Sequence, residues 1–122
     1  MAKTKEKPKE EKKFSFDEES ARKIQELQIL EQNLQNLAMQ KQAFQLELNE
    51  IINALSELKE TKDDVYKIVG SIMIKSKKEA LDKDLNSKKD IIDLRIKNIE
   101  KQEETLKEQL LKKRENLMQS MR

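Results

Sequence analysis

The side chains that could do chemistry in this chain are few in kind. Its 122 residues include 24 acidic and 26 basic residues, but no His and no Cys. Without imidazole or thiol groups the sequence excludes a Cys/His zinc site, a cysteine nucleophile and an imidazole base. Carboxylates are numerous, but paired-acid catalysis needs a concave pocket, and we expect these acids on solvated helix faces. The sequence therefore predicts no enzyme activity, no metal site and no cofactor.

One segment shares residue types with a phosphate-binding loop. Gly70 is followed by Ser-Ile-Met-Ile and then by Lys75 and Ser76. The segment lacks the second glycine of such a loop, and its β-branched flanks favour a hairpin over a loop that opens a helix. We interpret it as a hairpin turn.

Two short basic clusters could contact nucleic acid. They are Lys75, Lys77 and Lys78, and Lys112, Lys113 and Arg114. Each lies among acidic residues, and no aromatic stacking platform accompanies them. Residues 17–64 carry five basic and eleven acidic groups, whereas residues 65–122 carry fifteen basic and ten acidic groups. We therefore favour a solvated face, or contact with the acidic half of the same chain, over nucleic-acid binding.

Two long helices must position these groups. Apolar residues follow a strict three-four spacing from Leu27 to Leu58, interrupted only by Lys41, and a less regular one from Leu85 to Leu117. Such spacing is typical of a coiled coil, and neither stretch contains Gly or Pro. A capping box, Ser15 to Glu18, favours a helix start near residue 16. We predict helices over residues 16–61 and 77–121, paired antiparallel, with Lys41 opposite about residue 96, within reach of Asp93 or Glu100.

The segment between the helices predicts a β-hairpin over residues 65–75. Two β-branched runs flank Gly70-Ser71, and Gly supplies the positive φ that a two-residue turn requires. This register pairs Val69 with Ile72 and Ile68 with Met73. Both faces are then largely apolar, and a lone two-stranded hairpin of this kind is not stable in water. We therefore expect hairpins of several chains to assemble into a sheet or barrel through Val65, Tyr66, Ile68, Val69, Gly70, Ile72, Met73 and Ile74.

The predicted fold is dominated by α-helix: a long antiparallel two-helix coiled coil joined by one β-hairpin, with the hairpins forming an oligomeric β-barrel body. Residues 1–15, rich in Lys and Glu, should be a disordered charged tail, and residues 16–122 one domain. No apolar run is long enough for a membrane span or a signal peptide. We expect a soluble, cytoplasmic protein.

Apolar residues outside the coiled-coil seam fall into two groups. Near the hairpin are Leu46, Ile52, Ile91 and Leu94, which we expect to pack against neighbouring subunits. At the other end are Phe14, Phe16, Ile24, Ile29, Leu111, Met118 and Met121, beside the seam residues Leu27 and Leu117. The residues themselves leave two interpretations open for this end: frayed helices with ordinary exposed side chains, or an adaptable apolar surface for other proteins.

Three stretches of the sequence resemble the prefoldin family, and its archaeal β-type subunits in particular. They are Gln40–Leu48, Val65–Lys75 and Leu94–Leu110, within a resemblance that covers roughly residues 21–117. The Val-Tyr-Lys-x-Val-Gly hairpin between two equal helices is the most specific part, and a single hairpin fits the β type. The charged tail through Lys13 departs from the short N-terminus usual in that family.

This resemblance implies a hexamer of two α and four β subunits, whose hairpins form a double β-barrel carrying six coiled coils. It implies an ATP-independent holdase that captures non-native proteins at the coiled-coil tips and passes them to a group II chaperonin. The client-binding residues would be Phe14, Phe16, Ile24, Leu27, Leu111, Leu117, Met118 and Met121. Neither nucleic acid nor a membrane would be a partner. A coiled-coil scaffold or tether without general chaperone activity is the alternative.

Overall fold

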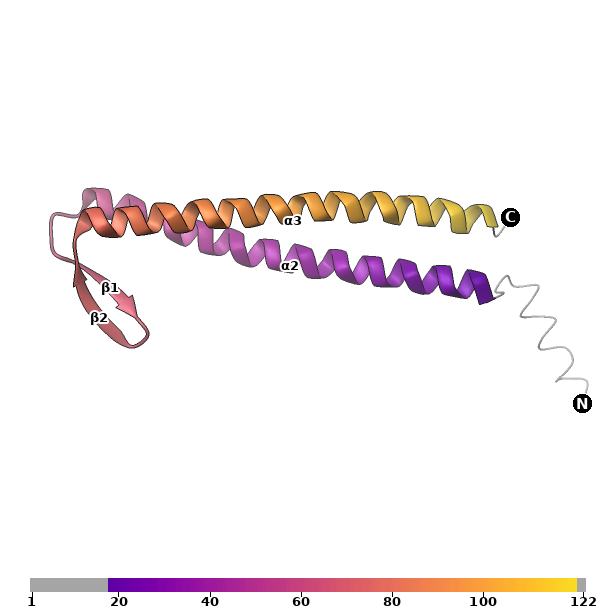
Figure 1. The fold of residues 1–122 in the computed structure, drawn as a ribbon, viewed down its shortest axis with the longest axis horizontal. Helices are drawn as coiled ribbons and strands as arrows, with labels where there is room; N and C mark the ends of the chain where they lie inside the picture. The colour runs from indigo at the N-terminus through magenta and orange to yellow at the C-terminus, as the bar shows by residue number, and fades with distance from the viewer. Residues whose placement is uncertain (1–17, 121–122) are drawn as a thin grey trace, which may run out of the picture. The chain divides into compact units, whose positions relative to one another are not determined.

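The computed structural model describes residues 18–120, which form two helices joined by a β-hairpin (Figure 1). The order is α2 (Glu18–Glu60), β1 (Val65–Val69), β2 (Ile72–Ser76) and α3 (Lys78–Ser120). The predicted helix–hairpin–helix fold is thereby confirmed. The predicted charged tail, the capping box from Ser15, and the candidate residues Phe14, Phe16 and Met121 lie outside the described residues.

Helices α2 and α3 each contain 43 residues. Neither holds a Gly or Pro, and Leu, Glu, Lys and Gln, which lose little rotamer freedom in a helix, dominate both. Acidic residues occupy the first turn of each helix, where they oppose the positive end of the helix dipole. The sequence predicts helices over 16–61 and 77–121; the observed inner ends, Glu60 and Lys78, each differ by one residue, and the predicted outer ends lie outside the described residues.

The chain divides into two compact units, each containing part of both helices. We call residues 18–38 with 101–120 the terminal unit, and residues 39–100 the hairpin unit. In the terminal unit Leu27, Leu30 and Leu110 are each 8% exposed and form a small core. Leu34, Leu106 and Leu117 pack against this core. All six occupy positions of the three-four spacing, as the sequence predicted.

The hairpin unit has its own core between α2 and α3. Ile51, Ile92 and Ile96 are buried there. Four partly buried residues of the same spacing surround them: Phe44, Leu48, Leu55 and Leu85. The guanidinium of Arg95 lies 5.6 Å from the centre of the Phe44 ring, within the range of a cation–π contact. The seam therefore holds the two helices together on the side where the hairpin leaves them.

The hairpin has the predicted register. Its antiparallel strands pair Val69 with Ile72, Ile68 with Met73 and Tyr66 with Lys75. Gly70 opens the two-residue turn with φ 63°, in the left-handed region. An added Cβ at Gly70 would meet no atom within 4 Å. The glycine is therefore required by backbone conformation and not by lack of space.

Over residues 18–120 no helix is both long enough and apolar enough to cross a membrane. The same part of the chain contains no group of three or more acidic side chains placed to hold a metal ion.

Candidate functional site

The two faces of the hairpin carry different side chains. Because directly paired residues share a face, one face carries Val65, Lys67, Val69, Ile72, Ile74 and Ser76, and the other carries Tyr66, Ile68, Met73 and Lys75. On the second face Ile68 is 71% exposed and Met73 65% exposed. Large apolar side chains thus meet solvent where none of residues 18–120 covers them.

The first face is anchored to α3 at its root. The Lys67 ammonium lies 3.1 Å from a carboxylate oxygen of Asp84. Val65 lines a groove with residues of both helices, including Leu58 and Leu85. These contacts come from β1 and leave β2 less covered, so that half or more of the Ile72 and Ile74 side chains is exposed. Each face of the hairpin therefore has an uncovered apolar part.

Burial of these residues would stabilise the hairpin substantially. Full burial of one Val, Ile or Met side chain contributes roughly 1.5–3 kcal/mol, and a free two-stranded hairpin is marginal in water. Both edges of the β1–β2 sheet also lack a neighbouring strand among the described residues. The hairpin thus has the properties of a surface that becomes covered in an assembly of chains.

Outside the seam, the helices of the hairpin unit also expose large apolar residues. Leu46, Ile52, Ile91 and Leu94 are between 42% and 61% exposed. Ile91 adjoins the buried Ile92 along α3, and Leu94 lies about half a helical turn from it. These side chains contribute nothing to the interhelical core, and the expectation that neighbouring subunits cover them stays a prediction.

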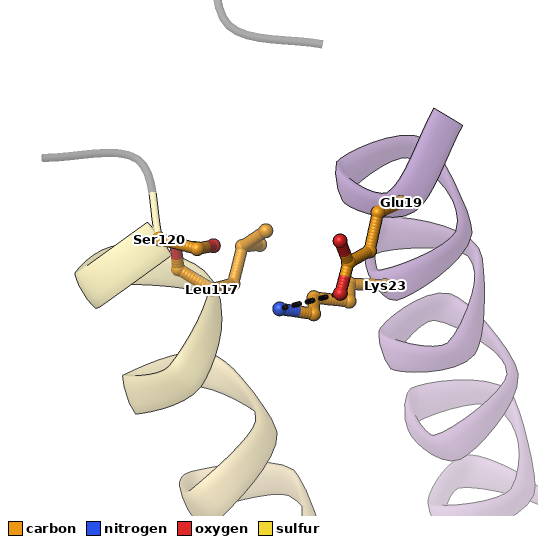
Figure 2. Close-up of polar contacts among 4 residues, drawn as sticks. All are labelled: Glu19, Lys23, Leu117 and Ser120. Carbon is orange, nitrogen blue, oxygen red and sulfur yellow. Dashed lines mark hydrogen bonds and ion pairs between the residues drawn. The ribbon is translucent and has the colours of Figure 1, made fainter. Parts of the chain in front are cut away.

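In the terminal unit, the candidate residues differ in exposure. Three of them are more than half exposed: Ile29 (56%), Leu111 (59%) and Met118 (65%). Ile24 and Leu117 are half-buried, and in Figure 2 the Leu117 side chain points from α3 toward α2. Leu27 is buried in the core of the terminal unit, so its side chain supports the helix pair and is not presented to solvent.

In the terminal unit, polar side chains make contacts near the end of α3 and near the beginning of α2. In α3 the Ser120 hydroxyl donates a hydrogen bond of 3.0 Å to the carbonyl oxygen of Leu117 (Figure 2). In α2 the Lys23 ammonium lies 3.9 Å from a Glu19 carboxylate oxygen. The Ser120 bond satisfies one of the last carbonyls that a helix end leaves without an intrahelical partner.

Ion pairs join the helices of the terminal unit. The Lys113 ammonium donates to a Glu26 carboxylate oxygen at 2.8 Å, and the Arg114 guanidinium to Glu31 at 2.9 Å. The hydrogen bond and charge of Lys113 lower the pKa of Glu26, with smaller contributions from the nearby basic residues of α2. The expected contact between this basic cluster and the acidic half of the chain is confirmed for Lys113 and Arg114.

Glu26 and Glu31 were not predicted from the sequence as partners of Lys113 and Arg114. A usable signal existed, because Lys113 occupies a seam position of α3, where a charge needs an opposite charge on the facing helix. The same reasoning applied to Lys41 gave Asp93 or Glu100. The structure confirms Glu100, whose carboxylate oxygen lies 3.7 Å from the Lys41 ammonium.

The segment that shares residue types with a phosphate-binding loop is a hairpin. Gly70 and Ser71 form its turn, and Lys75 lies in β2 with its ammonium 3.4 Å from a carboxylate oxygen of Asp64. The Gly70–Ser71 turn and Lys75 thus belong to a pair of strands, and they do not form a phosphate-binding loop of backbone amides.

The sequence of this chain is similar to those of known proteins. A family model described as "Prefoldin subunit" matches residues 21–122. The chain is 38% identical over 96 residues to "Prefoldin subunit beta" of Archaeoglobus fulgidus, covering 77% of this chain and 83% of that protein. It is 37% identical over 100 residues to the protein of the same name from Methanothrix thermoacetophila, covering 80% and 83%.

A solved structure shows the same fold. The crystal structure of the prefoldin beta subunit from Thermococcus strain KS-1 matches with a TM-score of 0.82 at 29% identity, covering 89% of this chain and 97% of that one. The family match spans both helices and the hairpin, the element that the sequence singled out as most specific. The chain therefore belongs to the prefoldin family and is of its archaeal β-subunit type.

Proposed function

We propose that this chain is a subunit of an ATP-independent holdase, which acts in the cytoplasm, binds non-native proteins and delivers them to a group II chaperonin. Prefoldin is a chaperone family, and its members assemble with other prefoldin subunits. The observation that carries the proposal is that large apolar side chains of this chain are exposed in both units. One set lies in the hairpin unit, including the hairpin itself, and the other lies in the terminal unit.

The hairpin set serves assembly. In the proposed hexamer, two α and four β subunits contribute their hairpins to a double β-barrel that covers residues such as Ile68 and Met73. The exposed Ile91 and Leu94 of α3 extend the apolar surface of the hairpin unit and are covered by adjacent subunits.

The terminal set contacts clients. Leu111, Met118 and Ile29 are exposed there, and the candidates Phe14, Phe16 and Met121, although outside the described residues, are close to it in sequence. Methionine adapts to irregular apolar partners because its side chain is flexible and polarizable. Several weak contacts from different subunits of one particle hold a client by avidity, so that no single residue is essential.

The experiment compares matched substitutions in the assembled protein. Leu111→Ser with Met118→Ser removes exposed apolar side chains, whereas Lys112→Ser changes an exposed charge next to Leu111. Lys113 and Arg114 are unsuitable controls because they pair with α2. Light scattering measures the aggregation of a chemically denatured protein after dilution, with and without each assembly.

We expect the double variant to keep its particle mass and to suppress aggregation several-fold less well, whereas Lys112→Ser acts like the wild type. If the unmodified assembly does not suppress aggregation of unrelated proteins, the chain is a scaffold or tether instead. Loss of suppression in Lys112→Ser with full activity of the double variant would show that clients are held by charge, contrary to the proposal.

A further inference from the structure

Helix α2 ends without a glycine after its last turn. Helices commonly end at a glycine, whose left-handed conformation lets backbone amides satisfy the last carbonyls. The only glycine of this chain is in the hairpin turn. The last backbone hydrogen bond at this end runs from the Thr61 amide to the Glu57 carbonyl, at 3.0 Å. The carbonyls beyond it need other donors.

Lys78 supplies these donors from the other side of the hairpin. Its ammonium donates to the carbonyl oxygen of Lys59 at 3.2 Å and to that of Thr61 at 3.1 Å. Lys78 is the first residue of α3 and is half-buried. An ammonium is unfavourable at the positive end of its own helix but favourable at the negative end of α2. The antiparallel arrangement brings these two ends together.

The two hydrogen bonds close the base of the hairpin. Thr61 and Lys78 are separated by 17 positions, which span both strands and their connections. Two further lysines brace the same region: Lys67 pairs with Asp84 on α3, and Lys75 with Asp64 in the connection before β1. Both of those pairs join exposed side chains, whereas the Lys78–Thr61 bond is part-buried and reaches the backbone itself.

We propose that Lys78 is a positioning residue that fixes the direction in which the hairpin leaves the helix pair. By tying the start of α3 to the end of α2, it holds both roots of the hairpin at a set separation. The hairpin surfaces of several chains fit together only if each hairpin leaves its helices at the same angle. This last step rests on the proposed function, whereas the effect of Lys78 on the hairpin of one chain does not.

The requirement is specific to a long donor side chain. Methionine has a similar length and no donor, so Lys78→Met removes both hydrogen bonds with little change in volume. Arginine carries several donors and can reach carbonyl oxygens, so Lys78→Arg should restore part of the effect. Lys77 is adjacent, exposed and equally charged, and Lys77→Met is therefore the matched control.

A distance measurement tests the conformational step. The chain has no cysteine, so spin labels at Ser71→Cys, in the turn, and Asp90→Cys, on α3, are unique. Double electron–electron resonance on the full chain, diluted with unlabelled chain, gives the turn-to-helix distance distribution. We expect Lys78→Met to broaden it, Lys78→Arg to narrow it again, and Lys77→Met to leave it unchanged. An unchanged distribution in Lys78→Met, with its helical circular dichroism intact, would overturn the proposal.

Assembly measurements test the second step. The concentration at which half of the chains are assembled should rise about tenfold or more in Lys78→Met, as expected for loss of hydrogen bonds from a charged donor, and stay unchanged in Lys77→Met. Broadened distances without a change in assembly would overturn the link to assembly. If Ile72→Lys with Ile74→Lys also leaves assembly unchanged, the hairpin is not the assembly element and the proposed function fails independently of the distances.

Discussion

Substitution of Gly70 isolates the effect of backbone conformation on assembly. The residue has φ 63°, a region in which side chains with a Cβ are disfavoured and β-branched ones most of all. Nothing lies within 4 Å of an added Cβ. A Cβ at this position therefore creates no clash within the chain, and its cost comes from backbone conformation.

The magnitude follows from this conformation. Holding a valine in the left-handed region costs on the order of 1–3 kcal/mol per chain, whereas asparagine adopts it much more readily. A free hairpin is marginal, so the strain is imposed chiefly when the hairpin is ordered by assembly. With four such chains in the proposed hexamer, Gly70→Val destabilises the particle by about 4–12 kcal/mol. Spread over five association steps, this raises the midpoint concentration of assembly roughly four- to sixty-fold.

The assay compares wild type, Gly70→Asn and Gly70→Val, each mixed with the partner subunit over a dilution series. Particle mass at each concentration gives the midpoint, and far-ultraviolet circular dichroism monitors the helices. We expect Gly70→Asn to assemble nearly as well as the wild type, and all three chains to remain helical.

Two results would refute the reasoning. Assembly of Gly70→Val at the wild-type midpoint would mean that the turn does not need positive φ in the particle. Equal weakening by asparagine and valine would mean that the position is constrained by contacts with another chain, and not by backbone conformation.

Three further outcomes are expected. Ile92→Ala should lower the free energy of unfolding in urea by about 2–5 kcal/mol, because Ile92 is 4% exposed. Ile91→Ala, at a half-exposed neighbour, should change this free energy by less than about 0.5 kcal/mol. Similar losses in the two variants would contradict the assignment of Ile92 to the seam. Ile72→Lys with Ile74→Lys should dissociate the oligomer while helical dichroism persists, since unpaired charges would be buried where chains meet, and an unchanged particle mass would disprove assembly through the hairpin. The pKa of Glu26 is lowered in the folded chain, so its ion pair stabilises the terminal unit at pH values above the ordinary glutamate pKa of 4.5 and loses this effect as the pH falls through the lower folded pKa. The melting temperature of Glu26→Gln should therefore fall less between pH 7 and pH 3 than that of the wild type. Parallel curves of melting temperature against pH would contradict this expectation.

Much of the fold could be predicted because its determinants are local. The three-four spacing fixes which side of each helix is buried, so Ile51 and Ile96 could be assigned to the seam without knowledge of their neighbours. A two-residue turn at a single glycine leaves one register, and Gly70 therefore determined every cross-strand pair. The partner of Lys41 could be limited to Asp93 or Glu100 because antiparallel helices with predicted ends leave few facing positions, and the structure shows Glu100.

Other features depend on how separate segments meet. From the sequence, Leu27 is a candidate both for the seam and for the client-binding surface. Only its packing with Leu30 and Leu110 in the structure shows that it is buried. The role of Lys78 depends on the conformation of residues 61–64, which determines whether α2 ends within reach of its ammonium. The available signal was weak: a long helix without a glycine after it, followed by a lysine at the start of the next helix.

Burial differs between the helix pair and the hairpin, so these two parts of the chain are stabilised in different ways. Seam residues such as Ile92 and Ile96 lose their exposure within one chain, so the helix pair is stabilised without any partner. Ile68 and Met73 are largely exposed in one chain, and in the proposed hexamer other chains cover them. Unfolding of the helices should therefore depend on concentration only to the extent that assembly adds to it. The strand pairs beyond the base that Lys78 closes should instead become more stable as the concentration of the chain rises. The same contrast explains why a strained Gly70 or a missing Lys78 bond is expected to weaken assembly and leave the helices intact.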